Sequence, residues 1–244
     1  MAPVEDAFYK ILESKTQEFH PVVPFNPYEE KLISFDLSEN NQELKAVNIA
    51  DIMEFGNYIS NQLEMYGAKF GYGGYNELRS LYNRSELFDT NLATTQQPII
   101  AEEPRRLHIG IDIWGVTGTE VYAPLNGVVH SFAYNDHLGD YGATIILSHQ
   151  LNDIFFHTLY GHISLKDIEN LKKGSLIIGG QKFATFGNVE ENGYWPPHLH
   201  FQIIKNMSSF KGDYPGVCKL SERNQYLENS PDPDLLLGMR KFIT

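Results

Sequence analysis

The sequence predicts an α+β protein whose larger part is a mainly antiparallel β core, a sandwich or barrel-like structure, with a helical region before it. Between residues 105 and 205, short apolar runs are separated by Gly, Asn, Asp and Pro. Many short strands with turn residues between them are typical of antiparallel sandwiches and barrels. Residues 48–66, by contrast, carry apolar side chains at steps of three and four, which indicates an amphipathic helix.

The N-terminal part of the chain mixes helical and irregular patterns. Residues 5–19 have apolar side chains near helical spacing, and residues 31–37 alternate loosely enough to suggest a short strand. The glycine-rich segment 67–88 predicts a loop followed by a helix that caps the core, and residues 94–100 read as a connector. We therefore divide the chain into three segments. These are a helical N-terminal region over 1–100, a β core over 101–210, and an irregular extension over 211–244 with a short helix near 219–228.

Composition limits the classes of function. The chain has 244 residues, a formal net charge of −12 and a hydrophobic fraction of 42%. This acidity argues against nucleic acid or an anionic membrane as a partner, because both attract basic surfaces. No apolar run approaches the roughly 20 residues that span a bilayer. The single cysteine, Cys218, excludes an intramolecular disulfide and fits a reducing compartment.

The first residues of the chain bear on its location. They contain neither the basic head nor the apolar segment of a secretory signal. As printed, the sequence predicts a soluble, cytoplasmic protein. A leader trimmed from the chain would change this expectation to an extracytoplasmic location. The sequence does not indicate an oligomeric state.

Two short stretches contain the residues that are candidates for metal binding and catalysis. RRLHIGIDIW at 105–114 contains His108 and Asp112, and PPHLHFQI at 196–203 contains His198 and His200. Apolar residues occupy the alternate positions of both stretches, so each predicts a strand with a buried face and an opposite face that bears the polar side chains. Two imidazoles and a carboxylate on one face are typical ligands of a zinc ion that keeps a position for water.

The residues alone leave the division of roles open. His108, Asp112 and one histidine of the 198/200 pair supply three ligands, and the other histidine or His162 is available to accept a proton from water. Each motif taken singly is weak evidence, because His-x-His pairs and a histidine four residues before an aspartate are common in strands with structural roles. Their shared pattern and shared face strengthen the metal hypothesis.

The chain over roughly 105–205 resembles the lysostaphin/LytM-type zinc endopeptidases, which have the duplicated hybrid motif fold. Ordered blocks with matching spacing carry the resemblance, and together they are more specific than any one of them. These blocks are HIGIDIWGVTGTEVYAPLNGVV, GDYGATIILSH, YGHIS, the LKKG…GGQKFATFG stretch and HLHFQI. The resemblance implies that His108, Asp112 and His200 bind one zinc ion. It also implies that His162 and His198 are the catalytic histidines.

The resemblance implies a metallopeptidase that hydrolyses an amide bond in a peptide, including a peptidoglycan cross-link, through a metal-activated water. Two alternatives are a non-hydrolytic binding or regulatory module on the same fold and an intracellular hydrolase of another substrate. The loop before HLHF departs from the family's small-residue pattern, since it reads NVEENGYWPP. Four residues are candidates for the substrate groove: Tyr75, Arg79, Tyr194 and Trp195.

Overall fold

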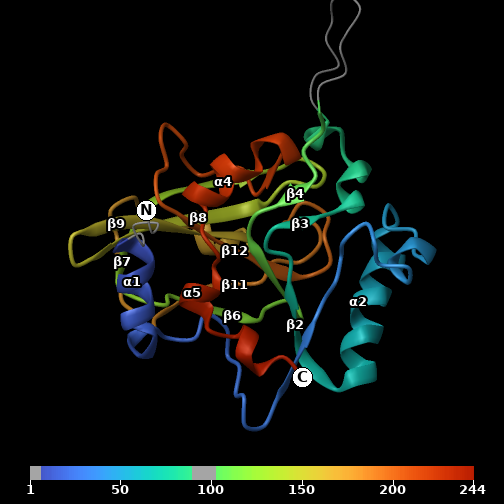
Figure 1. Cartoon of the computed structure of the whole chain (residues 1–244), viewed down its shortest axis with the longest axis horizontal. Coiled ribbons are helices and arrows are strands. Elements are labelled where there is room, and N and C mark those ends of the chain that lie inside the picture. Colours follow the sequence, from blue (N-terminus) through green and yellow to red (C-terminus); the bar gives the residue numbers. More distant parts are fainter. Residues whose placement is uncertain (1–6, 90–102) are drawn as a thin grey trace, which may run out of the picture.

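The computed structural model describes residues 7–89 and 103–244, and its largest element is an eight-stranded sheet (Figure 1). The parallel pair β1–β2 forms one edge, and all other neighbouring strands run antiparallel. In spatial order the strands are β1 (Lys31–Ser34), β2 (Ala68–Gly73), β5 (Ile111–Trp114), β12 (His198–Ile204), β9 (Ile154–Ile163), β8 (Gly142–Leu151), β7 (Gly127–Asn135) and β10 (Leu176–Ile177).

Two smaller sheets complete the β structure. One pairs β6 (Glu120–Tyr122) with β11 (Lys182–Thr185). The other has β4 (Leu107–His108) in the middle, between β3 (Glu77–Leu78) and β13 (Val217–Cys218). This second small sheet therefore brings together the N-terminal region, the first motif and the C-terminal extension.

The longest helix, α2 (Ile52–Tyr66), lies beside β2 and covers one side of the sheet edge (Figure 1). It begins where the Asp51 carboxylate accepts hydrogen bonds from the first-turn backbone, and it ends at Gly67 in the left-handed conformation. The other α-helices are α1 (Ala7–Ser14), α3 (Lys166–Glu169), α4 (Arg223–Asn229) and α5 (Asp234–Leu237). Short 3₁₀ helices are η1 (Thr16–Glu18), η2 (Leu44–Ala46), η3 (Ser80–Arg84), η4 (Glu86–Phe88), η5 (Leu220–Glu222) and η6 (Arg240–Phe242). Across the described ranges, no helix combines the length and apolar character needed to cross a bilayer.

The central strands have the two different faces that the alternation predicts. Ile111 and Ile113 of β5, with Leu199 and Phe201 of β12, are buried in the largest apolar cluster, which also contains residues of α1 and α5. The intervening residues of the same strands therefore point to the opposite face of the sheet. The predicted α+β class with a dominant antiparallel core is confirmed.

The first motif is not a single strand, as the alternation predicted. It breaks at residues 109–110 into β4 and β5, which belong to different sheets. Gly110 lies at the break, and a Cβ on it would lie 2.4 Å from ring atoms of His200. The glycine therefore allows the His200 ring to approach the backbone between the two halves of the motif.

The prediction of a loop and a helix for residues 67–88 is wrong in its first half. This segment forms β2, which pairs with both β1 and β5, and then β3. A Cβ on Gly71 would lie 2.3 Å from the ring of Phe35, so packing requires glycine at this position. Because glycine is uncommon in strands, its presence obscured the strand pattern in the sequence. The N-terminal region thus contributes strands as well as helices, and the three-segment division stays a prediction. The expected connector at 94–100 lies outside the described residues.

Candidate metal centre

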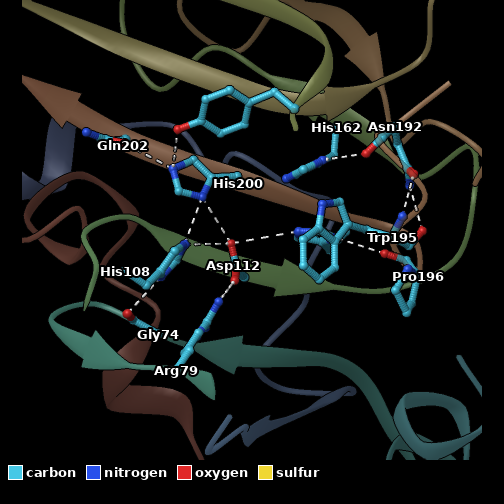
Figure 2. A network of polar contacts seen from close by, with 12 residues as sticks. Gly74, Arg79, His108, Asp112, His162, Asn192, Trp195, Pro196, His200 and Gln202 are labelled. Atoms are coloured by element: carbon cyan, nitrogen blue, oxygen red, sulfur yellow. Dashed lines mark hydrogen bonds and ion pairs between the residues drawn. The ribbon is translucent and has the colours of Figure 1, made fainter. Parts of the chain in front are cut away.

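The three predicted ligands converge on the polar face of the central strands (Figure 2). Asp112 and His200 are directly opposed across β5 and β12, and His108 approaches from β4. One ligand atom from each residue lies within 4.8 Å of the other two. All three side chains are buried, with relative exposures of 1% to 2%.

Hydrogen bonds define which ring nitrogens carry protons. Nδ1 of His108 lies 2.8 Å from the carbonyl oxygen of Gly74, which can only accept, so Nδ1–H donates and Nε2 keeps its lone pair. The Gln202 amide nitrogen donates to the Pro215 carbonyl and the Ser230 hydroxyl. Its carbonyl oxygen therefore faces Nε2 of His200 at 3.0 Å and accepts a hydrogen bond from it. The lone pair of His200 is then on Nδ1.

These assignments leave three acceptor atoms facing one another. Nε2 of His108 lies 2.9 Å from Nδ1 of His200, and Oδ1 of Asp112 lies 3.3 Å and 3.2 Å from these nitrogens. Acceptors this close and without a proton between them require a cation. Two neutral imidazoles and one carboxylate are a donor set that fits zinc. The geometry therefore defines a three-ligand metal site.

The second oxygen of Asp112 is held by Arg79. Nη1 of Arg79 donates to Oδ2 of Asp112 over 2.6 Å, and Nε donates to Glu77 over 2.5 Å. Burial raises the pKa of Asp112, but the charge of Arg79 outweighs it and holds this pKa well below its ordinary value. Burial and the charge of Arg79 lower the pKa of His108 to about 4. Both ligands are therefore in the metal-binding protonation state at neutral pH.

The two predicted catalytic histidines lie next to this centre. Nδ1–H of His162 donates to the Asn192 carbonyl over 2.8 Å, and Nδ1–H of His198 donates to the Pro196 carbonyl over 2.7 Å. Their ring centroids are 4.1 Å apart, and Nε2 of His198 lies 3.9 Å from Oδ1 of Asp112. Burial is the largest effect in lowering both pKa values, that of His198 to about 4. Each ring thus keeps Nε2 as an acceptor.

The backbone of His162 adopts the left-handed conformation, which is strained for any residue other than glycine. Its φ is +62°, and its N–H donates to the carbonyl of Tyr141 over 2.9 Å. Non-glycine residues rarely adopt this conformation, and where they do the surrounding structure must hold them in it. Here the fixed strand end and the Asn192 hydrogen bond hold the imidazole beside His198.

A pocket of about 180 Å³ adjoins the metal site and both catalytic candidates. Its wall includes Trp195, which is 4% exposed, and Trp114, which stacks on His198 at 3.9 Å. The loop 192–197 is held by two hydrogen bonds between Asn192 and Trp195. The remaining wall comes from the N-terminal region, from residues near Tyr141, and from the C-terminal extension over 213–217.

The groove candidates have different positions. Arg79 and Trp195 line the pocket, whereas Tyr75 and Tyr194 are absent from its described lining. The hydroxyl of Tyr75 instead donates to the Ser230 carbonyl, and its ring packs against the main apolar cluster. Tyr194 is half exposed, with a φ of +63°. Gln202 was not predicted as a site residue, although its position two residues after His200 places it on the same strand face.

Residues 106–211 match the profile of Peptidase family M23. The chain is 28% identical over 138 residues to a protein of Haemophilus influenzae described as an uncharacterized metalloprotease. That match covers 54% of this chain and 27% of the Haemophilus protein. The matched part of this chain therefore spans about a quarter of that relative's length.

Similar solved structures include a zinc-containing peptidase of Vibrio cholerae and the catalytic domain of lysostaphin from Staphylococcus simulans. The Vibrio structure is 28% identical with a TM-score of 0.33, and the match covers 45% of this chain and 30% of that one. The lysostaphin domain is 20% identical with a TM-score of 0.38, and the match covers 70% of this chain and 96% of that one.

Proposed function

We propose that the protein is a zinc-dependent endopeptidase that hydrolyses an amide bond in a peptide. The observation that carries this proposal is the convergence of three acceptor atoms, from His108, Asp112 and His200, within 4.8 Å in a buried site. The hydrogen bonds to Gly74 and Gln202 support it, because they direct the lone pairs of both imidazoles toward Asp112. The match of residues 106–211 to Peptidase family M23 supports a peptide as the substrate.

Zinc bound here supplies a Lewis acid and lowers the pKa of a bound water toward 7. The chain's own residues handle the proton. His162 and His198 each use Nδ1–H on a backbone carbonyl, so each presents a neutral Nε2 that can accept the proton of the attacking water. A ring that has taken up this proton becomes a donor, which can stabilise the oxyanion or protonate the leaving amine.

The pocket restricts the substrate. At about 180 Å³ it is smaller than the roughly 300–1,000 Å³ typical of small-molecule sites, so we propose a short, flexible peptide segment rather than a folded protein. A peptidoglycan cross-link has this character and is the substrate class we favour. Such a substrate requires an extracytoplasmic location for the active protein. A cytoplasmic location would require a different peptide.

Metal content tests the site directly. We expect the purified parent protein to hold one zinc per chain by elemental analysis, and the His108→Ala and His200→Ala variants to lose most of it. His149→Ala is the matched control, because this buried histidine bonds to Asn126 and Thr158, away from the metal site. Unchanged zinc content in both ligand variants would show that the ligand assignment is wrong.

Digestion tests the reaction. Zinc-loaded protein is incubated with muropeptides, oligoglycine and a broad peptide library, and products are identified by mass spectrometry. We expect cleavage that is lost in His162→Ala and His198→Ala proteins that still hold zinc. Binding of one of these peptides without cleavage by the parent protein would favour the non-hydrolytic module instead.

A further inference from the structure

Arg79 makes a contact that neither the family profile nor the groove prediction assigns. Its guanidinium is 2% exposed and bridges two carboxylates, Asp112 at 2.6 Å and Glu77 at 2.5 Å. The family match covers residues 106–211, so Arg79 lies outside it. Figure 2 shows Arg79 approaching Asp112 from the side opposite to His200.

We propose that Arg79 is a positioning residue that restricts Asp112 to one metal-binding oxygen and is itself held in place by Glu77. This inference rests on the proposed metal site, but not on any particular substrate. A carboxylate can bind a cation through one or both oxygens. Because Oδ2 of Asp112 accepts the hydrogen bond from Arg79, only Oδ1 faces His108 and His200.

The hydrogen bonds around Arg79 keep its planar group fixed. Its Nε donates to Oε2 of Glu77, and Oε1 of Glu77 accepts a hydrogen bond from the backbone N–H of Leu37. Glu77 also pairs with His108 in the register of β3 and β4. The rigid fork of a guanidinium suits such a bridge, whereas a lysine ammonium would act as a single point charge.

Although Arg79 lines the pocket, two of its three guanidinium nitrogens are committed to carboxylates of the protein. Nε and Nη1 are engaged by Glu77 and Asp112, and Nη2 lies against Gly74, where an added Cβ would be 2.1 Å away. The Gly74 carbonyl on the same segment orients His108. Residues 74–79 therefore orient two of the three ligands, and we infer that the N-terminal region completes the metal centre of the family domain.

Metal affinity and a spectroscopic signature test this role. We expect Arg79→Met to bind zinc about 10–100-fold more weakly in competition with a chromophoric chelator, as is usual when an outer partner of a ligand is removed. With cobalt in place of zinc, the freed Oδ2 can also coordinate. The visible absorption should therefore weaken toward that of a higher coordination number. Arg79→Lys should give intermediate values in both measurements.

Arg84→Met is the matched control. Arg84 lies in the same segment and packs over the Trp195 ring at 4.7 Å, but none of its described contacts is with a metal ligand. We expect it to keep the parent's zinc affinity and cobalt spectrum. Equal affinity and an unchanged spectrum in folded Arg79→Met or Arg79→Lys would overturn the proposal.

A folding defect must not hide the result. Circular dichroism is recorded for each variant to check that it folds. If neither Arg79 variant folds, the Glu77→Gln variant tests the proposal instead, because it keeps Arg79 and removes only the carboxylate charge that holds it. A shifted cobalt spectrum in Glu77→Gln supports the proposal, and an unchanged one overturns it. If the parent protein itself binds no zinc, the proposed function fails instead, so the two failures are distinguishable.

Discussion

At the scale of single residues, Gly74 shows how closely the backbone approaches the metal ligands. Its φ is +103°, and its carbonyl oxygen lies 2.8 Å from Nδ1 of His108. A Cβ at this position would lie 2.1 Å from Nη2 of Arg79 and 2.8 Å from Nδ1 of His108. Both the conformation and the lack of space therefore require glycine.

We expect Gly74→Ala to destabilise the protein and to weaken zinc binding, because the new methyl group must displace Arg79 or His108. The control is Gly118→Ala, where φ is +81° but nothing lies within 4 Å of the added Cβ. That control isolates the backbone cost of about 1–2 kcal/mol. Urea unfolding and chelator competition measure the two effects. Identical losses of stability, with unchanged zinc affinity in both, would contradict this prediction.

At the scale of elements, helix α2 supports the wall of the pocket from behind. Phe55 of α2 is fully buried, and its ring meets that of Trp114 edge-on at 5.9 Å. Trp114 in turn stacks on His198 at 3.9 Å. The helix thus fixes the plane of a proposed catalytic imidazole through one intervening ring.

Removing this ring tests the contribution of the helix. We expect Phe55→Ala to lower the free energy of unfolding by about 3–5 kcal/mol, the usual cost of truncating a buried aromatic residue. Met53→Ala on the same helix is the control, because Met53 is 70% exposed, and it should change stability by less than about 0.5 kcal/mol. Equal unfolding midpoints in urea for the two variants would show that α2 does not support the core in this way.

Elements differed in how well the sequence predicted them. Helix α2 and strand β12 have clear periodicity, and the alternation of His198 and His200 with apolar residues placed both on the polar face. Strand β2 was missed because Gly71 and Gly73 are poor strand residues. Both positions require glycine because an added Cβ would collide with Phe35, which lies in a distant part of the sequence. The ion pair of Arg79 was not predicted for the same reason, since its partner Asp112 is 33 residues away.

At the scale of the whole molecule, buried histidines make stability depend on pH. Burial lowers the pKa of His149 to about 4, whereas an unfolded histidine titrates near 6.5. Between these values the unfolded chain binds a proton that folded His149 does not. Its contribution to stability is therefore complete above about pH 6.5 and is lost as the pH falls toward 4.

A variant isolates this effect. With chelator present, we expect the parent protein to lose about 2 kcal/mol more stability than His149→Asn between about pH 7.5 and about pH 5. Burial raises the pKa of Asp140 to about 6, so this carboxyl changes stability with pH in the opposite direction. The effect of Asp140 is the same in both proteins and therefore cancels from the comparison. Urea unfolding at both pH values measures the difference. A difference that does not change with pH would show that His149 is not held neutral.

The register of the central strands has a consequence for the order of folding events. Asp112 pairs with Gly73 on one side and with His200 on the other, and His200 also pairs with Gly161, next to His162. A slip of one residue would turn these side chains to the wrong face. Because the paired residues are far apart in the chain, their contacts form slowly. In a refolding time course, zinc uptake should therefore coincide with the final folding phase. It would report when the strands have paired in the correct register.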